Sequence, residues 1–393
     1  MVTSTWDRAQ AGSAVATPAT TNWVVDPSKL KRMLAGRYVW DAWPLLNLDG
    51  SVARPFGREL WIAPSSETTI THPGQRHDVA RLWLANATSE GTWVGEGALW
   101  DEGLHVGSRQ WAGSSTMDPN TGMVTVLYTA AGVFGEETLT YGQRIIGTRG
   151  RLNPHGDFTS IISWEPHHDL FEVPAEHYKP PAAVSEPGRD QDALRHPAYF
   201  RDPRDGGQYV VFSATMAAAT ASADGAIGIA RMLGNNLYDW YVQPPLLTAD
   251  GVAHTLERPH LIERHGTYYL FATVHDRGFA DGITAPHGLY GWWAPALDSP
   301  FTPLNGSGLV LTNPPEEPAQ MSSWLVLRNG WVVGSAAYSD TQGRSLEDLA
   351  AGNPDWMADH YLGTLSTWTH LSVSRDGTRI DEQRYTPPLW DVR

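Results

Sequence analysis

The sequence predicts an all-β protein, and within that class a β-propeller. Short runs rich in aromatic and β-branched residues recur along most of the chain, and turn residues interrupt them. Helix-like stretches of about 10 to 15 residues do not separate these runs, which argues against an α/β fold. The 393 residues include 38 Gly and 28 Pro, which allow many tight turns. A β-sandwich would be about half as long, and a double sandwich remains the alternative.

The first 36 residues carry the signals of a helical N-terminal segment. Ser4 or Thr5 can cap a helix that continues through WDRAQA, and Pro27 is suited to the first turn of a second helix. We therefore expect one catalytic domain over residues 1–393, with the helical segment 1–36 packed against it.

Beyond residue 37 the chain changes to strand-like patterns. Eight runs alternate or are rich in residues that favour strands: ELWIA, DVARLWLA, TGMVTVLYTA, FTSIISW, GQYVVFSA, GTYYLFATV, GLYGWW and GWVVGSAAY. Two stretches, 163–198 and 340–357, are too irregular or too rich in Pro for strands. We expect loops or short helices there, lining one face of the molecule.

The composition excludes several classes of function. Lys and Arg total 28 against 43 Asp and Glu, a formal charge of -15, so a nucleic acid or an anionic membrane surface would be repelled. The chain has no Cys, which removes disulfides, thiolate nucleophiles and Cys-bound metals. No apolar run approaches the roughly 18 residues of a membrane span. We expect a soluble monomer that is secreted, although the N-terminal residues lack the order of a signal peptide.

The first candidate catalytic motif is the string VWDAWP at residues 39–44. It places Asp41 between Trp40 and Trp43 at the start of the β region. A core strand with one solvent-facing acid explains it equally well. The functional interpretation is a carboxylate at the bottom of an aromatic pocket, because the apolar faces of sugars stack on indole rings.

Two further acids stand beside proline. In YFRDP, Pro203 restricts the backbone of Asp202 to extended conformations and so fixes the direction of its side chain. In TLERPH, Glu257 comes two residues before Pro259. Each acid alone is more simply a surface turn residue. Three acids fixed beside Pro or Trp in one all-β chain form a joint pattern that favours a catalytic site.

Glycoside cleavage with retention of configuration explains why such acids would occur together. One ionised carboxylate attacks the anomeric carbon, and a protonated carboxyl about 5 Å away protonates the leaving oxygen. A third acid can stabilise the oxocarbenium-like sugar through its hydroxyl groups as charge develops.

Six strings resemble glycoside hydrolase family 68, which contains levansucrases, inulosucrases and β-fructofuranosidases. They run in the family's order over residues 39–314: VWDAWPL, QWAGS, YFRDP, LTADGVAHTLERPH, FADGITAPHGLYGWW and PFTPLNGSGLVLTNP. The resemblance implies a five-bladed β-propeller with a central funnel, and sucrose as the fructosyl donor. Loops and short helices would surround the funnel.

Matching the motifs residue by residue implies the roles of the acids. Asp41 takes the place of the nucleophile, Asp202 that of the transition-state stabiliser and Glu257 that of the acid/base. Trp40 and Trp111 would form walls of the fructosyl subsite.

The resemblance also implies further substrate-binding residues. Arg201 would reach toward the glucosyl side, and Arg258 belongs to the same motif as the acid/base. His275 stands near a position where relatives carry a His or Arg for sucrose. Arg277 is a competing candidate for that role, because the spacing around this loop varies.

Some positions depart from the family pattern. Ala112 stands where some relatives have Ser, and Thr255 stands where some have Glu. Ser322 replaces a Tyr, which is expected to alter the support or tuning of the acid/base. Ser213 stands at a position that is acidic in relatives.

We predict no metal and no other cofactor. The calcium site of Gram-positive relatives uses an Asp shortly before the acid/base, and His254 stands there in this chain. The strings HD at residues 77–78 and HHD at residues 167–169 combine His and Asp, but they lie in loop-like sequence without matching ligands elsewhere.

The sequence therefore predicts a sucrose-cleaving fructosyltransferase of the levansucrase or inulosucrase type, acting on sucrose and on fructan or other sugar acceptors. A β-fructofuranosidase that mainly hydrolyses sucrose is the alternative within the enzyme class. The departures at residues 213 and 322 leave open a third class, a sugar-binding propeller without turnover.

Overall fold

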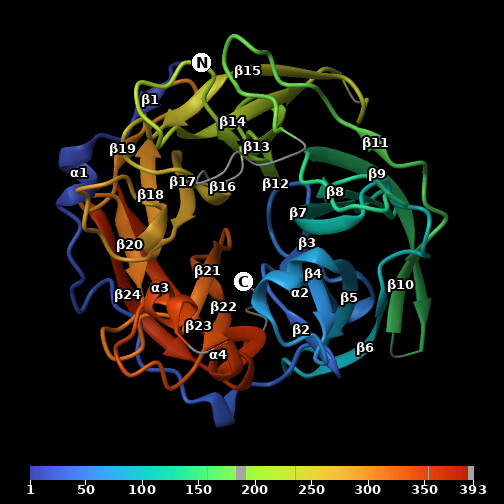
Figure 1. The fold of residues 1–393 in the computed structure, drawn as a ribbon. Helices are drawn as coiled ribbons and strands as arrows, with labels where there is room; N and C mark the ends of the chain where they lie inside the picture. Colours follow the sequence, from blue (N-terminus) through green and yellow to red (C-terminus); the bar gives the residue numbers. More distant parts are fainter. Residues whose placement is uncertain (157, 183–191, 235, 353, 388–393) are drawn as a thin grey trace.

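Antiparallel sheets stand side by side around a common axis in the computed structural model of the chain (Figure 1). The structure describes residues 1–156, 158–182, 192–234, 236–352 and 354–387. Its architecture is all-β, as predicted from the sequence. All eight predicted strand runs overlap strands of the structure, so these predictions are confirmed.

The first half of the chain forms one ten-stranded sheet. Two antiparallel groups contribute its main path: β3 (Trp43–Asn47), β4 (Glu59–Glu67), β5 (Arg81–Ala87) and β6 (Trp93–Ala98), then β7 (Arg109–Asp118), β8 (Met123–Ala131), β9 (Gln143–His155) and β10 (Phe158–Ile162). A parallel pairing of β3 with β7 joins the two groups. The short strands β2 (Arg37–Val39) and β11 (His168–Asp169) pair with β4 and β9.

Three more sheets complete the ring. The next comprises β12 (Leu194–Arg201), β13 (Gln208–Thr215), β14 (Gly225–Met232) and β15 (Trp240–Thr248), with β1 (Ser4–Thr5) parallel to β15. Another comprises β16 (Glu257–Arg264), β17 (Thr267–Val274), β18 (Gly288–Ala294), β19 (Thr302–Pro303) and β20 (Leu309–Thr312). The last comprises β21 (Met321–Val326), β22 (Trp331–Tyr338), β23 (Tyr361–Ser374) and β24 (Gly377–Arg384).

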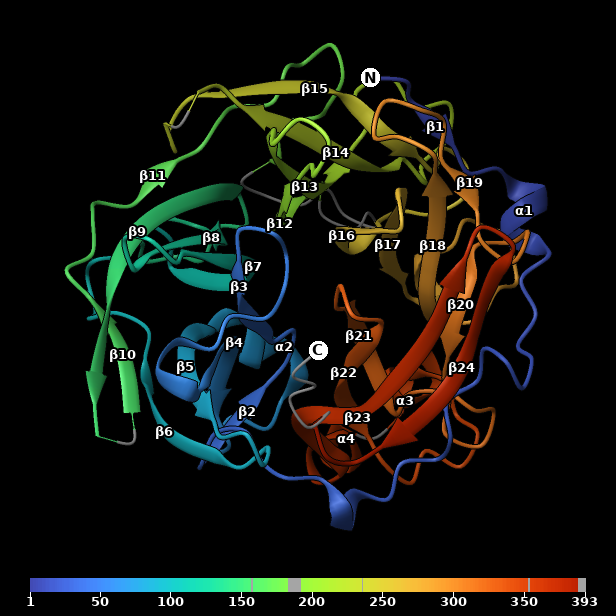
Figure 2. The same ribbon diagram turned by 180° about the vertical axis from the view of Figure 1, so that it is seen from behind.

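The hydrophobic core lies between neighbouring groups of strands. One cluster fills the space between the β12–β15 and β16–β20 sheets, and others fill the spaces on either side around the ring. A further cluster joins the last sheet to the first group, where Trp368 of β23 meets Trp61 of β4 edge to face at 5.6 Å. Packing between the two ends of the β region therefore closes the ring, as Figure 2 also shows.

The N-terminal segment contains less helix than the sequence predicted. Ser4 and Thr5 pair with β15 instead of capping a helix. Asp7 is the residue that caps the short helix α1 (Arg8–Gly12), because its side chain accepts the N–H of Gln10 at 2.8 Å. Pro27 does begin a helical turn, but that 3-10 helix covers only Pro27–Lys29. The remainder of the segment runs along the outside of the ring (Figure 1).

Trp6 attaches this segment to the ring. Its side chain is fully buried, its Nε1 donates to the carbonyl of Ser307 at 2.9 Å, and its ring packs 5.0 Å from Tyr290 and 5.3 Å from Trp292. We expect Trp6→Ala to lower the free energy of unfolding by about 3–5 kcal/mol, because it leaves a large cavity. Guanidinium denaturation measures this effect. The matched change Trp23→Ala, at a 38% exposed side chain, is expected to cost at most about 1 kcal/mol; equal losses would contradict this account.

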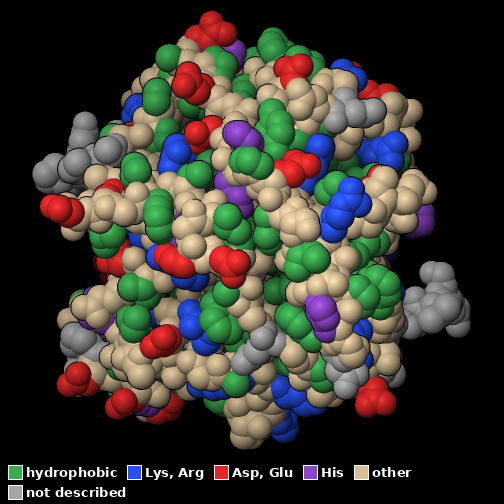
Figure 3. All heavy atoms as spheres, turned by 90° about the vertical axis from the view of Figure 1, so that its right-hand side faces the viewer, with side chains coloured by type: hydrophobic (Ala, Val, Ile, Leu, Met, Phe, Trp, Pro, Cys, Tyr) green, Lys and Arg blue, Asp and Glu red, His purple; other side chains and the backbone are tan. Residues whose placement is uncertain are grey.

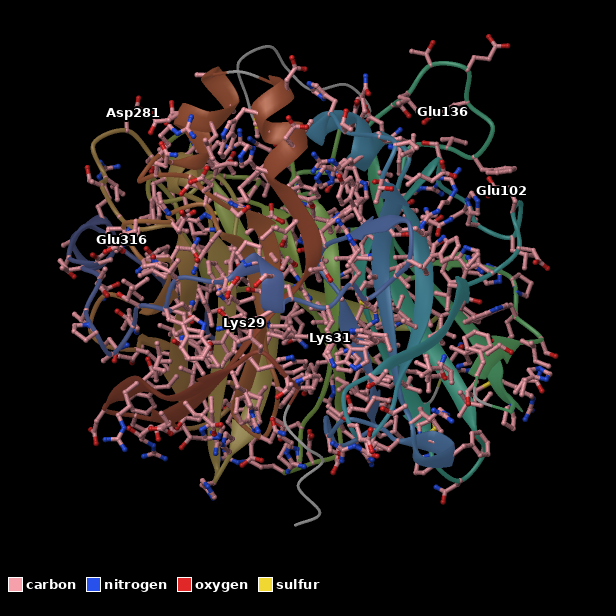
Figure 4. The ribbon with its side chains drawn as sticks, turned by 90° about the horizontal axis from the view of Figure 1, so that it is seen from below. Lys29, Lys31, Glu102, Glu136, Asp281 and Glu316 are labelled. Atoms are coloured by element: carbon pink, nitrogen blue, oxygen red, sulfur yellow. The ribbon has the colours of Figure 1, made fainter. Side chains whose placement is uncertain are left out.

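Short helices gather at one end of the ring. They are α2 (Pro73–Asp78), α3 (Leu346–Ala351) and α4 (Pro354–His360), which lie together at the upper edge of Figure 4. Two more 3-10 turns cover Pro55–Gly57 and Asp276–Gly278. The short helices predicted within 340–357 are confirmed, whereas α2 was not predicted: residues 77–78 were interpreted as loop-like, and the predicted strand run DVARLWLA begins at its last residue, Asp78. In the described ranges no helix is long and apolar enough to cross a membrane.

The stretch 163–198 was predicted as loop or short helix, and this is only partly right. It contains β11, and β12 already begins at Leu194. Residues 183–191 of the stretch lie outside the described residues. The start of β12 matters for function, because it contributes to the cavity described below.

The side face of the molecule carries both signs of charge. Figure 3 shows acidic and basic side chains interspersed over the outer strands, without a large area of one sign. Ion pairs at the surface include Arg81 with Glu102 and Arg144 with Asp169. This face therefore offers no large surface of a single charge.

Candidate active site

A cavity of about 740 Å³ opens at the end of the ring that carries α2, α3 and α4. Ligand sites in proteins commonly have volumes of about 300–1,000 Å³. Its carboxylates come from Asp41, Asp78 and Glu257. Its basic lining residues are Arg76, Arg195, Arg258 and Arg277, together with His72, His77, His196, His275 and His287.

The cavity lies where the innermost strands of the ring begin. Asp41 precedes β3, Trp111 is the third residue of β7, Glu257 is the first residue of β16, and Ser323 is the third residue of β21. Because β3 and β7 run parallel and the starts of all these strands line one cavity, side chains far apart in sequence meet here. The other ends of the same strands line a different pocket of about 320 Å³.

Asp41 is held in one orientation by hydrogen bonds. Its backbone is in the left-handed region, with φ of 46°, and its N–H donates to Ser335 Oγ at 2.8 Å. The hydroxyl of Ser323 donates to Asp41 Oδ1 at 2.5 Å, and Arg258 Nη1 lies 3.7 Å from the same oxygen. The carboxylate is thus fixed and partly neutralised while its side chain keeps 17% of its exposure toward the cavity. This arrangement suits a nucleophile.

Glu257 is surrounded by cationic or proton-carrying groups. Arg195 approaches its Oε1 with Nη2 at 2.5 Å and Nε at 3.2 Å, and His196 Nδ1 lies 2.8 Å from Oε2. Burial alone would raise the pKa of Glu257, but Arg195 and His196 together hold that pKa well below its usual value. These neighbours therefore favour the carboxylate form of Glu257, which can accept a proton.

Arg258 connects the two acids. It follows Glu257 directly in β16, and its buried guanidinium donates to the carbonyl of Ala42 at 2.8 Å and to Ser323 Oγ at 3.3 Å. Its backbone φ of 50° is again left-handed. A change at this residue would therefore move both carboxylates.

Asp202 does not join the other two acids, and its predicted place in the site is wrong. It follows the last residue of β12, while Arg195 and His196 stand at the first end of that strand. Six residues of strand separate the two ends by about 20 Å. Asp202 lines the pocket at the opposite end of the ring, where Tyr268 Oη donates to its Oδ1 at 2.5 Å and the N–H of Arg204 at 2.9 Å.

The predicted role of Arg201 is wrong for the same reason. As the last residue of β12 it is exposed and lines the opposite pocket, where its Nε reaches the carbonyl of Gly206 at 3.4 Å. It therefore does not reach the glucosyl side of a substrate in the main cavity.

The position of Asp202 gives a testable result. We expect Asp202→Asn to leave the rate of sugar cleavage within about threefold of the wild type, because the side chain is outside the cavity and an amide oxygen can still accept both hydrogen bonds. The measurement is kcat/KM, with thermal unfolding as a check on folding. A loss of 100-fold or more in a folded variant would restore a catalytic role for this acid.

Most of the other predicted residues do line the cavity. Trp40, Trp111, Thr255, Arg258, His275, Arg277 and Ser322 all contribute to its walls. Ala112 does not: its side chain is buried in the hydrophobic cluster of the ten-stranded sheet. It points away from the cavity because successive residues of a strand face opposite sides. Ser213 is also outside, where its hydroxyl donates to the carbonyl of Leu256 at 2.5 Å and supports the residue before Glu257.

Sequence reasoning missed Arg195 and His196. The string RHP at 195–197 has the same arrangement as RDP at 201–203, with a side chain fixed by a following proline. Only the RDP string was interpreted as part of a catalytic site. The strand-like pattern that runs from one string to the other could have shown that the two copies lie at opposite ends of one strand.

The helix α2 adds residues that were also missed. The ring of His77 lies 4.9 Å from that of Trp40, and its carbonyl accepts from Trp111 Nε1 at 3.3 Å. Burial lowers the pKa of His77, which favours its neutral form. Asp78 accepts a hydrogen bond from Tyr141 Oη at 3.1 Å. These contacts connect the predicted aromatic walls to the rim of the cavity.

The His and Asp residues at 167–169 lie elsewhere. His167 contacts Tyr128 Oη at 3.0 Å, and burial lowers the pKa of His167 to about 4. His168 packs against Tyr238. Within the described part of the chain, no group of three or more His, Cys, Asp or Glu side chains is arranged to hold a metal ion.

Comparisons with known proteins match nearly the whole chain. A family model described as Levansucrase/Invertase, of glycoside hydrolase family 68, matches residues 1–224 and 218–348. Levansucrase LscC of Pseudomonas savastanoi pv. glycinea is 28% identical over 432 residues, which cover 99% of this chain and 94% of the relative. An extracellular sucrase of Zymomonas mobilis subsp. mobilis is 28% identical over 353 residues, or 84% of each protein.

The fold of the chain is also closely similar to that of a solved structure. An inulosucrase from Halalkalicoccus jeotgali bound to kestose superposes with a TM-score of 0.90 at 34% sequence identity. The match covers 98% of this chain and 97% of that protein.

Proposed function

The chain belongs to glycoside hydrolase family 68, the levansucrase and invertase family, and from this premise we propose that it cleaves sucrose and transfers the fructosyl unit. The observation that carries the proposal is the meeting of Asp41 and Glu257 in one cavity from the starts of different inner strands. The similarity to levansucrases and an inulosucrase supports sucrose as the donor and sugars or fructans as acceptors.

Asp41 is the nucleophile in the proposed reaction. Its carboxylate attacks C2 of the fructosyl unit, and the bond from C2 to the glycosidic oxygen breaks. Ser323 donates to the carboxylate and keeps it in one orientation during the attack, while Ser335 accepts the backbone N–H of Asp41 and holds the main chain in place. Because Arg258 and these hydroxyls are already in place before the substrate binds, little reorganisation accompanies the step.

Glu257 is the acid/base. It gives its proton to the glycosidic oxygen as glucose leaves, and then takes a proton from the acceptor hydroxyl that attacks the fructosyl-enzyme. The lowered pKa of Glu257 favours the second of these steps. The acid form becomes more populated as the pH falls, so the first step is favoured on the acidic side of neutrality.

The aromatic walls supply the sugar-binding surface. Trp40 and Trp111 line the same cavity as Asp41, and we assign them to the fructosyl subsite because indole rings stack on the C–H faces of sugars. Thr255, His275, Arg277 and Ser322 are proposed to bind the hydroxyls of the donor or acceptor. Both candidates for the glucosyl side in this loop, His275 and Arg277, line the cavity.

The remaining features of the proposal concern architecture and setting. The antiparallel groups beginning at β3, β7, β12, β16 and β21 are proposed to be the blades of a five-bladed propeller with a single catalytic domain. Similarity to an extracellular sucrase supports secretion. We propose a monomer that needs no added cofactor.

Incubation with concentrated sucrose tests the function. A transferase releases more glucose than fructose, because part of the fructose is transferred to acceptors. Equal amounts of the two sugars would instead identify a β-fructofuranosidase that hydrolyses sucrose.

The position of Asp202 outside the cavity favours one alternative from another class of function, a sugar-binding protein without turnover. Sucrose binding measured by calorimetry, together with an absence of glucose release, would establish this alternative and overturn the enzymatic proposal.

A further inference from the structure

His196 stands between two hydrogen-bonding partners that require different states of its ring. Its Nδ1 lies 2.8 Å from Glu257 Oε2, a distance at which a protonated Nδ1 donates to the carboxylate. The same Nδ1 lies 3.2 Å from the backbone nitrogen of Arg258, whose N–H donates to an unprotonated Nδ1. One nitrogen therefore has a suitable partner whether or not it carries a proton.

The backbone around His196 is strained in a way that fixes this position. Its φ is 57° although it is not a glycine, and it precedes a proline. The register of β12 shifts between Arg195 and Ala198, and the register of β16 shifts between Glu257 and His260. Strained residues of this kind persist where the surrounding structure holds them, and they gather at functional sites.

Neighbouring contacts hold the strained conformation. The N–H of His196 donates to Thr129 Oγ1 at 2.8 Å, and Thr129 Oγ1 in turn donates to the carbonyl of Ala112 at 3.0 Å. Arg258, which faces the His196 ring from β16, also has a left-handed φ of 50°. Two irregular segments thus meet at a single imidazole beside the acid/base.

We propose that His196 is a positioning residue that stores the proton which Glu257 uses, an inference that rests on the proposed role of Glu257. In the resting pair the His196 ring is an imidazolium with protons on both Nδ1 and Nε2, and Glu257 is a carboxylate; loss of the Nδ1 proton leaves a neutral ring. The proton moves from Nδ1 to Oε2, and Glu257 then gives it to the glycosidic oxygen as the bond to C2 breaks. The N–H of Arg258 satisfies the unprotonated Nδ1 until the acceptor hydroxyl returns a proton to Glu257, which passes it back.

The charged surroundings explain why a store is useful. Arg195 on β12 and Arg258 on β16 both interact electrostatically with Glu257 and favour its carboxylate, and His77 on α2 lies within electrostatic range of His196. A carboxyl in this setting holds a proton poorly by itself. A base within hydrogen-bond distance of Oε2 keeps one proton within the pair over a wider range of pH.

His196→Gly tests the proposal, because glycine adopts a positive φ without strain and the change removes only the ring. We expect kcat/KM for sucrose to fall about 100-fold at neutral pH. The alkaline limb of its pH profile should move at least about one unit toward lower pH. Added imidazole should restore both. If kcat/KM is lower at every pH but the alkaline limb of the profile stays at its wild-type position, the ring has only a structural role and the proposal is overturned.

His265→Gly is the matched control. His265 also has a positive φ, 52°, but it is exposed on the turn between β16 and β17, outside the cavity. This variant should keep the wild-type profile and show no response to imidazole. A shifted limb in this control would mean that the shift at residue 196 does not report on the pair.

A measurement without turnover separates this inference from the proposed function. The ¹⁵N chemical shifts of the His196 ring, assigned by comparison with His196→Asn, report whether Nδ1 carries a proton. We expect a protonated Nδ1 in the wild type and an unprotonated Nδ1 in Glu257→Leu, where only the N–H of Arg258 remains as a partner. Identical shifts in both proteins would overturn the proton store, even if sucrose is cleaved. The expected shifts in a protein that does not cleave sucrose would instead overturn only the proposed function.

Discussion

Replacing Asp41 with Asn is expected to lower the release of glucose from sucrose by about 10⁴-fold or more. The amide is similar in size, its Oδ1 can still accept from the Ser323 hydroxyl, and the backbone N–H of residue 41 still donates to Ser335 Oγ, but the amide cannot attack the anomeric carbon as an anion. Binding of sucrose should change much less than turnover, because only one oxygen of the cavity wall is replaced. Initial rates of glucose release, with calorimetric binding of sucrose, measure the two effects.

Asp202→Asn is the matched control for this experiment, since it makes the same chemical change at the opposite end of the ring. A folded Asp41→Asn protein that retains more than a tenth of wild-type turnover would exclude Asp41 as the nucleophile. Loss of turnover in both variants would indicate a general effect on the fold if thermal unfolding shows that Asp202→Asn is destabilised, and a catalytic role for Asp202 if that variant is folded.

Glu257→Gln is expected to lower sucrose turnover by about 10²–10⁴-fold, the range typical of a missing general acid/base. A fructosyl fluoride should be a far better donor for this variant than sucrose, because fluoride leaves with little protonation. Added azide should then speed the second step, since azide attacks without a base, and should form a fructosyl azide.

Glu263→Gln makes the same change at the other end of β16, in the opposite pocket, and should behave as the wild type. The turnover rate of Asp41→Asn should not increase with the fructosyl fluoride as donor or with added azide. If Glu257→Gln loses the same factor of activity with the fructosyl fluoride as with sucrose, relative to the wild type, the Glu257 side chain is not the proton donor.

The sequence predicted the strands well because the pattern that forms them is local. Runs such as GTYYLFATV and GWVVGSAAY combine strand-forming residues with flanking turns, and tertiary packing agreed with that preference. The N-terminal segment failed for the opposite reason. Ser4 and Thr5 were suited to a helix cap, but the free edge of β15 gave their backbone a partner that local sequence does not reveal.

The candidate site was predicted in part for a comparable reason. The motifs around Asp41 and Glu257 located two side chains that the fold brings to one cavity. The RDP motif looked equally suitable, but its position depends on which end of β12 carries it. Only the direction of the inner strands distinguishes Arg195 and His196 from Arg201 and Asp202, and no short motif encodes that direction.

Because separate inner strands each contribute a wall of the cavity from their first residues, the walls are independent of one another in sequence. An insertion in an outer hairpin lengthens the chain between two walls without displacing either, and a substitution at a strand start that makes no contact with another wall leaves the backbone of the neighbouring strands in place. Such an architecture permits chemical diversification by exchanging one side chain at a time, and an imidazole beside the acid/base is one outcome that it can accommodate.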